Sequence, residues 1–250
     1  MGWTKIFDGS EPSRVNKWLA HEGVCSRREA EALLAAGQVT IDGETATAPG
    51  AKIRPGQVLA LVGGASPVGA TYVLNKPVGY VSAQPEPGQI PAARLLTSAN
   101  LQGPAFLAPG RDARLAPLGR LDQDSRGLLL LSEDGVLAKA VIGPHSALDK
   151  EYVVTVTGAI DAGKLSLLRH GLSLDGRVLK PARVTPLGGG RLRFVLREGR
   201  KRQIRRMCAA VGLDVSDLAR VRIGPLSLGD LPEGRWRALS DGERAALLAR

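Results

Sequence analysis

The sequence predicts an α+β protein of two domains, a small one over residues 1–62 and a larger one over residues 71–250. Three observations support this. Two short helical patterns open the chain, the uncharged stretch GGASPVGA at 63–70 reads as a linker, and the remainder alternates strand-like and helical segments. With 44% hydrophobic residues the chain can bury a sizeable core. We expect the larger domain to hold a mixed, mainly antiparallel sheet with flanking helices.

The first domain contains the clearest helix signals. Apolar residues recur at helical spacing over 15–23, and Ser26 with Glu29 forms a capping box that begins a second helix over 26–37. The segments QVTIDGETA and IRPGQVLALVG each combine a strand with a turn. Two helices followed by strands are therefore expected here.

In the larger domain, alternating apolar residues are clearest in KEYVVTV and RLRFVLR. The expected strands cover 71–75, 128–132, 151–157 and 191–197. The expected helices lie in DGVLAKAVIG, DAGKLSLLRHG, RQIRRMCAAVG and SDGERAALLAR. The glycine- and proline-rich stretch 83–113 is typical of loops outside the core.

Charge is concentrated in one short segment. The net charge is +10, yet residues 1–64 hold seven basic and seven acidic residues, whereas 191–206 hold eight basic and one acidic. Such a stripe favours binding to phosphates over the alternative of a solvated charged face. No run is long enough to span a membrane and no secretory signal is visible, so a cytoplasmic protein is expected. The two cysteines, Cys25 and Cys208, predict neither a disulfide framework nor a metal site.

The segment GRLDQDSRGLLLLSEDG at 119–135 places a polar turn before a leucine-rich strand. Asp122, Asp124, Gly127 and Glu133 have the spacing of an EF-hand calcium loop. Against calcium, the fifth position of that loop is a cation, Arg126, and the flanking residues lack the pattern of two helices. We expect no metal here.

Three arginines of RQIRRMCAAVG face different surroundings on a helical projection. Arg202 and Arg206 lie opposite the apolar stripe and suit phosphates, whereas Arg205 lies at its margin and needs an anionic partner, for which the chain offers Asp122. The alternative is three solvated arginines. Tyr152 shares a strand face with Lys150 and is either a core tyrosine or a catalytic one.

Two sets of motifs resemble known families. RVNKWLAHEGVCSRREAEALLAAGQVTIDG resembles the alpha-L RNA-binding domain, whose paired helices present basic residues to structured RNA. NKPVGYVSA, GRLDQDSRGLLLLSEDG, KEYVVTV and EGRKRQIRRMC, in this order, resemble the motifs of RNA pseudouridine synthases of the RsuA/RluB/RluE/RluF branch, with a lean toward its RluF-like members. The resemblance implies a pseudouridine synthase catalytic domain behind an RNA-binding domain.

By this resemblance Asp122 is the catalytic aspartate, Tyr152 the base-stacking tyrosine and a candidate base, and Arg205 the arginine paired with the aspartate. Arg120 matches the arginine of the RLD signature near the displaced base, and Leu218 matches the floor of the uracil pocket. The reaction detaches uracil from ribose, turns it and rejoins it through carbon 5. Whether the carboxylate attacks the sugar, attacks the base or assists a glycal stays open.

The remaining expected contacts to RNA come from cations. Lys150, Arg202 and Arg206 are assigned to substrate in the larger domain, and Arg27 and Arg28 in the smaller one, where basic residues oppose the helix dipole. The implied partner is structured RNA, most directly large-subunit ribosomal RNA or an assembly intermediate, with small-subunit ribosomal RNA, transfer RNA and a purely binding assembly factor as alternatives. We expect the protein to need no cofactor and to be a monomer.

Overall fold

The computed structural model describes residues 3–25, 27–62, 69–104, 106, 108–110 and 113–249, with Arg28 described by its backbone alone. Contacts divide the chain into two compact units, one of Met1–Ala70 with Glu133–Ala138 and one of Thr71–Ser132 with Lys139–Arg250. The linker expected at 63–70 lies largely outside the described residues, as does the predicted cap Ser26. Both stay predictions.

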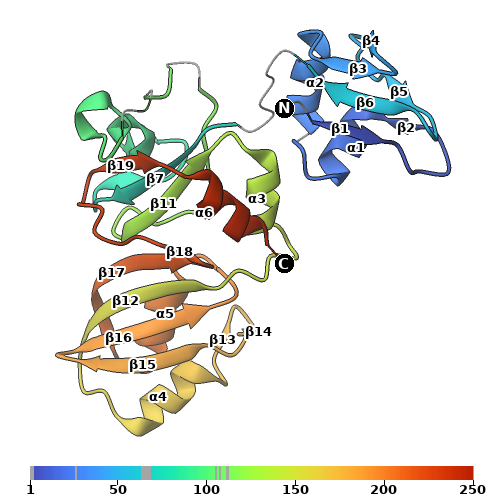
Figure 1. The fold of residues 1–250 in the computed structure, drawn as a ribbon. Coiled ribbons are helices and arrows are strands. Elements are labelled where there is room, and N and C mark those ends of the chain that lie inside the picture. The colour runs from blue at the N-terminus through green and yellow to red at the C-terminus, as the bar shows by residue number, and fades with distance from the viewer. Residues whose placement is uncertain are drawn as a thin grey trace. The chain divides into compact units, whose positions relative to one another are not determined.

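The smaller unit packs two helices and a short antiparallel sheet around one core (Figure 1). Its elements are β1 (Thr4–Ile6), β2 (Ser13–Arg14), α1 (Val15–His21), α2 (Arg27–Ala35), β3 (Val39–Ile41), β4 (Glu44–Thr45), β5 (Lys52–Ile53) and β6 (Val58–Leu61). The strands follow the order β1-β6-β3-β4, with β2 paired to β5. Trp18 and Leu19 of α1 and Leu34 of α2 are buried, as their helical spacing predicts.

The larger unit holds a nine-stranded sheet within the described residues. Its strands and helices are β7 (Thr71–Lys76), β8 (Tyr80–Val81), β9 (Ile90–Pro91), β10 (Ala116–Pro117), β11 (Arg126–Ser132), α3 (Gly135–Ile142), β12 (Lys150–Thr157), α4 (Ala162–Arg169), β13 (Ser173–Leu174), β14 (Arg177–Val178), β15 (Arg183–Gly188), β16 (Arg191–Leu196), α5 (Gln203–Ala210), β17 (Asp214–Ile223), β18 (Leu226–Ser227), β19 (Trp236–Ala238) and α6 (Asp241–Leu248). The contact division assigns the first residues of α3 to the smaller unit.

The main path of the sheet runs β15-β16-β12-β17-β11-β7-β19 (Figure 1). Its pairs are antiparallel except β11 with β17, which run parallel, so the expectation of a mixed, mainly antiparallel sheet is confirmed. At that parallel pair Gly127 lies opposite Arg220, with φ of +102°, and a Cβ at Gly127 would lie 2.3 Å from the Arg220 carbonyl oxygen. Glycine is therefore required where the two halves of the sheet meet.

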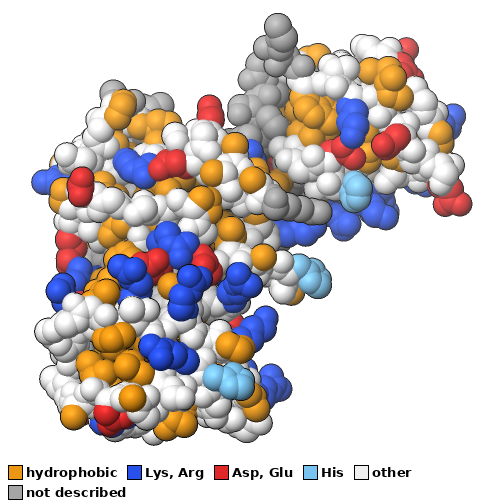
Figure 2. Space-filling model, turned by 60° about the horizontal axis from the view of Figure 1, so that its bottom comes forward, with side chains coloured by type: hydrophobic (Ala, Val, Ile, Leu, Met, Phe, Trp, Pro, Cys, Tyr) orange, Lys and Arg blue, Asp and Glu red, His pale blue; other side chains and the backbone are white. Residues whose placement is uncertain are grey.

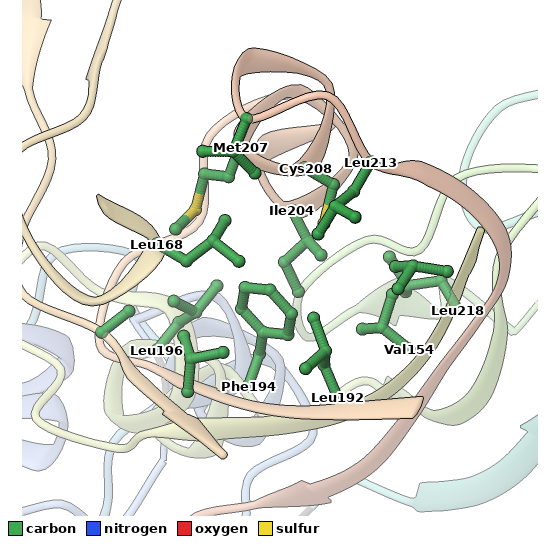
Figure 3. Close-up of a cluster of buried hydrophobic side chains, with 14 of the residues drawn as sticks. Val154, Leu168, Leu192, Phe194, Leu196, Ile204, Met207, Cys208, Leu213 and Leu218 are labelled. Carbon is green, nitrogen blue, oxygen red and sulfur yellow. The ribbon is translucent and has the colours of Figure 1, made fainter. Parts of the chain in front are cut away.

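One large core of this unit lies between the sheet and helices α4 and α5. Figure 3 shows Ile204, Met207 and Cys208 of α5 above Phe194 of β16, with Leu168 of α4 beside them. The apolar stripe expected on α5 is thus buried, and its polar face carries the arginines. Burial raises the pKa of the Cys208 thiol to about 12, so this cysteine is a packing residue.

The structure departs from expectation in two segments. The stretch 83–113 is not all peripheral loop, because Ala92 and Leu96 are buried in and beside a 3₁₀ helix over Ala92–Leu95. The ten-residue strand β17 is missing from the expected elements, since its sequence mixes aspartate and arginine with apolar residues. In the described part of the chain no helix combines the length and apolarity needed to cross a bilayer.

Candidate active site

A cleft of about 910 Å³ opens in the larger unit, lined by residues 117–125, by residues 196–205, by α3 and the segment after it, and by side chains of β12 and β17. It brings together seven of the ten residues that the sequence singled out: Arg120, Asp122, Lys150, Tyr152, Arg202, Arg205 and Leu218. Arg206 is not part of the lining, Arg27 belongs to the smaller unit, and the side chain of Arg28 lies outside the described part. Lys and Arg side chains gather in a band on the larger unit, with acidic side chains among them (Figure 2).

The loop Gly119–Ser125 carries Asp122 and is held by groups distant in sequence. Ser82 Oγ donates to the carbonyl of Leu121 at 2.7 Å and accepts from its N–H at 2.9 Å. The N–H of Gly79 donates to the carbonyl of Gln123 at 2.8 Å. These bonds fix the side of the loop that faces the segment after β7.

Two buried cations hold the ends of the same loop. Lys76 Nζ donates to the carbonyl of Ser125 at 2.7 Å, and Arg220 Nη2 donates to the carbonyl of Gly119 at 2.9 Å while its Nε donates to that of Leu128 at 2.8 Å. Both side chains are almost fully buried, and burial lowers the pKa of Lys76 to about 8. Neither role is predicted from the sequence, because a single cation in an apolar strand gives no pattern.

The carboxylate of Asp122 is not hydrogen-bonded within this network. Its backbone carbonyl accepts from the N–H of Ser125 at 3.1 Å, but its side chain makes no hydrogen bond or ion pair with any residue that the structure describes. Asp122 is half-buried and lines the cleft. Its backbone is therefore immobilised while its side chain stays available to a bound molecule.

The expected ion pair between Arg205 and Asp122 is not formed. Arg205 Nε lies 3.3 Å from Asp124 Oδ2, its Nη2 donates to the Asp124 carbonyl at 2.7 Å, and its Nη1 donates to the Val215 carbonyl at 3.1 Å. The loop directs Asp124 toward α5, and Asp124, two positions after Asp122, therefore contacts Arg205. The position of Arg205 at the margin of the buried face agrees with its 14% exposed side chain.

Arg202, the residue before α5, and Arg206 within it also have carboxylate partners. Arg202 donates through both Nη atoms to Asp124, at 3.1 and 2.8 Å, and Arg206 donates through both to Asp175, at 2.9 and 2.6 Å. Burial would raise the pKa of Asp124, but the hydrogen bonds from Arg202 and the charge of Arg205 hold it below its usual range. The hydrogen bonds from Arg206 likewise lower the pKa of Asp175. Both carboxylates are therefore charged at neutral pH.

The basic residues expected to form one stripe over 191–206 do not share one surface, because the first of them lie on strand β16. Leu192 and Phe194 of β16 point into the core, so Arg191 and Arg193 project from the opposite face of the sheet, where Arg193 lies 3.3 Å from Glu151. The prediction of a single basic stripe is therefore wrong for Arg191 and Arg193. Within the stripe, the cations that line the cleft lie between residues 197 and 205.

Tyr152 and Leu218 form part of the cleft wall. Tyr152 on β12 pairs in register with Arg220 on β17 and is half-exposed, whereas Leu218 is buried at 6% exposure. Lys150, on the same strand face, donates to the carbonyls of Val141 at 3.3 Å and Leu148 at 3.1 Å. Burial, followed by the charge of Arg220, lowers the pKa of Lys150. In this arrangement Lys150 ties the segment after α3 to the cleft.

Comparisons with known proteins identify the family. Residues 70–210 match the family model of RNA pseudouridylate synthases, and residues 13–59 match that of the S4 domain. The chain belongs to the RNA pseudouridine synthase family. The expected family, activity class and two-part fold are therefore confirmed.

Relatives cover nearly the whole chain. An uncharacterized RNA pseudouridine synthase of Aquifex aeolicus (strain VF5) is 35% identical, over 94% of this chain and 93% of that one. The dual-specificity RNA pseudouridine synthase RluF of Escherichia coli (strain K12) is 35% identical, over 92% and 76%. A relative from Mycobacterium bovis is 36% identical, over 92% and 91%. A crystal structure of a pseudouridylate synthase superposes with a TM-score of 0.63 at 25% identity, covering 94% of this chain and 99% of that one. This pseudouridine synthase is therefore of the RluF type and acts on RNA.

Proposed function

We propose that this enzyme converts a uridine of large-subunit ribosomal RNA to pseudouridine and that Asp122 is its catalytic carboxylate. One observation carries the assignment of Asp122. The main chain around it is bonded at Leu121, Gln123 and Ser125, whereas its own carboxylate makes no hydrogen bond or ion pair with the described residues and lines the same cleft as Tyr152. A preorganised carboxylate without a hydrogen-bond partner is suited to act on a bound base or sugar.

The reaction breaks the bond between ribose carbon 1′ and uracil nitrogen 1 and joins carbon 1′ to carbon 5. Carbon 5 loses its proton and nitrogen 1 takes up one, so the product is an isomer of the substrate. Asp122 attacks the sugar, attacks the base or assists formation of a glycal. Tyr152 lies on the wall where it stacks on the uracil and is the candidate to accept the carbon 5 proton, directly or through water. Leu218 supplies an apolar contact to the ring. The exposed side chain of Arg120 is placed to fill the space left by the displaced base.

Arg205 keeps a role in this proposal, although Asp124 is its partner. Its guanidinium is bonded to the main chain of the same loop, two residues after Asp122, so it contributes positive charge where an anionic intermediate forms. Arg202 and Arg206 contact phosphates, and the S4 domain with Arg27 and Arg28 adds affinity for structured RNA. Transfer RNA, an alternative that the sequence leaves open, is a second substrate class to be tested, and the relative RluF is itself named as a dual-specificity enzyme.

The decisive experiment for Asp122 is the Asp122→Asn variant. We expect single-turnover release of tritium from carbon 5 of labelled ribosomal RNA to fall by at least about a thousandfold, with RNA affinity within about threefold of the parent. Asp214→Asn is the matched control, since Asp214 is exposed, outside the cleft lining and without an ion pair in the described residues. Tritium release by Asp122→Asn within about tenfold of the parent rate would refute the assignment.

The RNA target is tested separately in cells with and without this gene. Pseudouridine mapping of large-subunit, small-subunit and transfer RNA should show the loss of a site in large-subunit RNA. A loss confined to either other class would replace the proposed target and leave the role of Asp122 untouched.

A further inference from the structure

Arg202, which lines the cleft, and Arg206, which lies outside its lining, are each bound to a carboxylate in the manner of a phosphate complex. Arg202 and Arg206 each hold one carboxylate through both terminal nitrogens, with donor–acceptor distances between 2.6 and 3.1 Å. An arginine fork binds a phosphate through the same pair of parallel hydrogen bonds. Asp124 and Asp175 therefore occupy the positions that two RNA phosphates would take.

Both pairs are accessible to exchange. The side chains of Arg202 and Asp124 are 43% and 44% exposed, and those of Arg206 and Asp175 are 36% and 74% exposed. Ion pairs at this exposure are weak, because water solvates the separated charges well. An incoming phosphate can thus replace either carboxylate.

The carboxylate of Asp175 is not needed to hold its own hairpin. Arg200 donates to three carbonyls of β13 and β14, those of Leu174 at 3.2 Å, Arg177 at 3.1 Å and Val178 at 2.8 Å. Asp175 itself has φ of +53°, in the left-handed region where asparagine is accepted as readily as aspartate. An Asp175→Asn variant is therefore expected to keep the hairpin and the turn.

We propose that Asp124 and Asp175 are specificity-determining residues, which compete with RNA phosphates for Arg202 and Arg206. This inference rests on the proposed phosphate contacts of these two arginines. An RNA that presents a phosphate in poor geometry replaces one anion on the arginine with another, and this exchange adds little to its affinity. An RNA whose fold aligns phosphates with both forks displaces both carboxylates with full hydrogen bonding. The two aspartates thus suppress binding to unstructured RNA more than binding to the substrate.

Salt dependence gives the sharpest signature of this competition. A paired arginine has no net charge to neutralise, so its phosphate contact releases few counterions. An unpaired arginine releases about 0.7 counterions for each phosphate that it contacts on a single strand. Asp175→Asn should steepen the plot of log affinity against log salt by about that amount. It should also tighten binding of oligouridylate roughly fivefold at about 0.1 M salt, and binding of a large-subunit ribosomal RNA transcript less.

Binding is measured in an Asp122→Asn background, so that turnover of the RNA does not affect the measured affinity. The catalytic role of Asp122 is tested separately by tritium release, so failure of one proposal can be distinguished from failure of the other. Asp214→Asn provides the same change of charge at an exposed site without an ion pair in the described residues, and should leave the salt slope near that of the parent. In an otherwise native enzyme, Asp175→Asn should keep the single-turnover rate at saturating RNA. Asp124→Asn should also tighten oligouridylate binding but lower that rate, because it removes the carboxylate that pairs with Arg205.

A double-mutant cycle distinguishes competition from a general gain of charge. When Arg206 is replaced by glutamine, Asp175→Asn should no longer steepen the salt slope. An unchanged slope for Asp175→Asn alone, weaker oligouridylate binding, or an equal effect with and without Arg206 would each overturn the proposal. Circular dichroism of every variant confirms the fold before binding is compared.

Discussion

The two sides of the cleft are built from different kinds of interaction. The loop Gly119–Ser125 is held by hydrogen bonds from buried groups, Ser82, Lys76 and Arg220, to main-chain atoms. The opposite side, at the N-terminal end of α5, depends on ion pairs of exposed side chains. Arg202 pairs with Asp124 across the cleft, and Arg206 pairs with Asp175. A solute cannot reach the buried hydrogen bonds of the first side. The exposed arginines of the second side can exchange their carboxylate partners for an anion from solution.

This difference matches the demands of catalysis and of binding. A reacting carboxylate has to stay within a fraction of an ångström of its productive position, which buried main-chain bonds achieve. A phosphate contact needs a donor that is accessible and already oriented, which a paired surface arginine provides. Variants of the buried side should therefore alter stability and turnover, and variants of the exposed side should alter binding.

The largest effect is expected where the buried side meets β17. In Gly127→Ala the new Cβ would lie 2.3 Å from the carbonyl oxygen of Arg220, which also anchors the loop. We expect the free energy of unfolding to fall by more than about 3 kcal/mol in urea titrations. Gly171→Ala is the matched control, because Gly171 has the same φ of +102° with nothing within 4 Å of a Cβ. It should cost about 1 kcal/mol, and equal losses for the two variants would refute the clash.

A second effect depends on pH. Since the pKa of Lys76 is lowered from 10.5 to about 8 in the folded protein, the unfolded chain binds more protons between these values, and the free energy of unfolding rises with pH across that window. Lys76→Met should lack this rise, which we expect to amount to about 1–3 kcal/mol between roughly pH 7.5 and 10. Urea titrations at both pH values measure it. The same rise in parent and variant would show that Lys76 is not the group responsible.

The smallest effect on stability is expected from loss of a buried hydroxyl, and it tests whether the loop Gly119–Ser125 has a specific role in turnover. Ser82→Ala removes both hydrogen bonds to Leu121, and should lower the free energy of unfolding by about 1–2 kcal/mol and kcat more than KM. Ser132→Ala removes a buried hydroxyl that lies 2.6 Å from that of Thr71, away from the loop. It should cost similar stability and leave kcat unchanged. A matching fall in kcat for Ser132→Ala would contradict a specific role of the loop.

The strands and helices with strong periodicity could be predicted from the sequence. KEYVVTV predicts a strand over 151–157 and β12 covers Lys150–Thr157, while the leucine run lies in β11. The apolar stripe of Ile204, Met207 and Cys208 is buried as expected. In β17, by contrast, charged residues interrupt the apolar pattern because Arg220 serves the loop and Asp217 pairs with Arg126 at 2.7 Å.

The candidate site residues were assigned through resemblance more than through spacing, and the expected pair of Arg205 with Asp122 is not formed. Asp122 and Asp124 are both acids within reach of α5, and no local pattern distinguishes which of them meets Arg205. The choice depends on the path of the loop, which bonds from β7, from Ser82 and from β17 determine together. Such long-range determinants are not visible in a single sequence.

The anchoring of the loop also sets the order in which the enzyme can be completed during synthesis. Arg205 lies 81 residues after its main-chain acceptor at Asp124, and Arg220 lies 101 residues after its acceptor at Gly119. A nascent chain that has exposed only its first half contains Asp122 but neither of these anchors. Contacts of this sequence separation form late and slow folding. The nascent enzyme therefore acquires an ordered active site only when its C-terminal strands have left the ribosome.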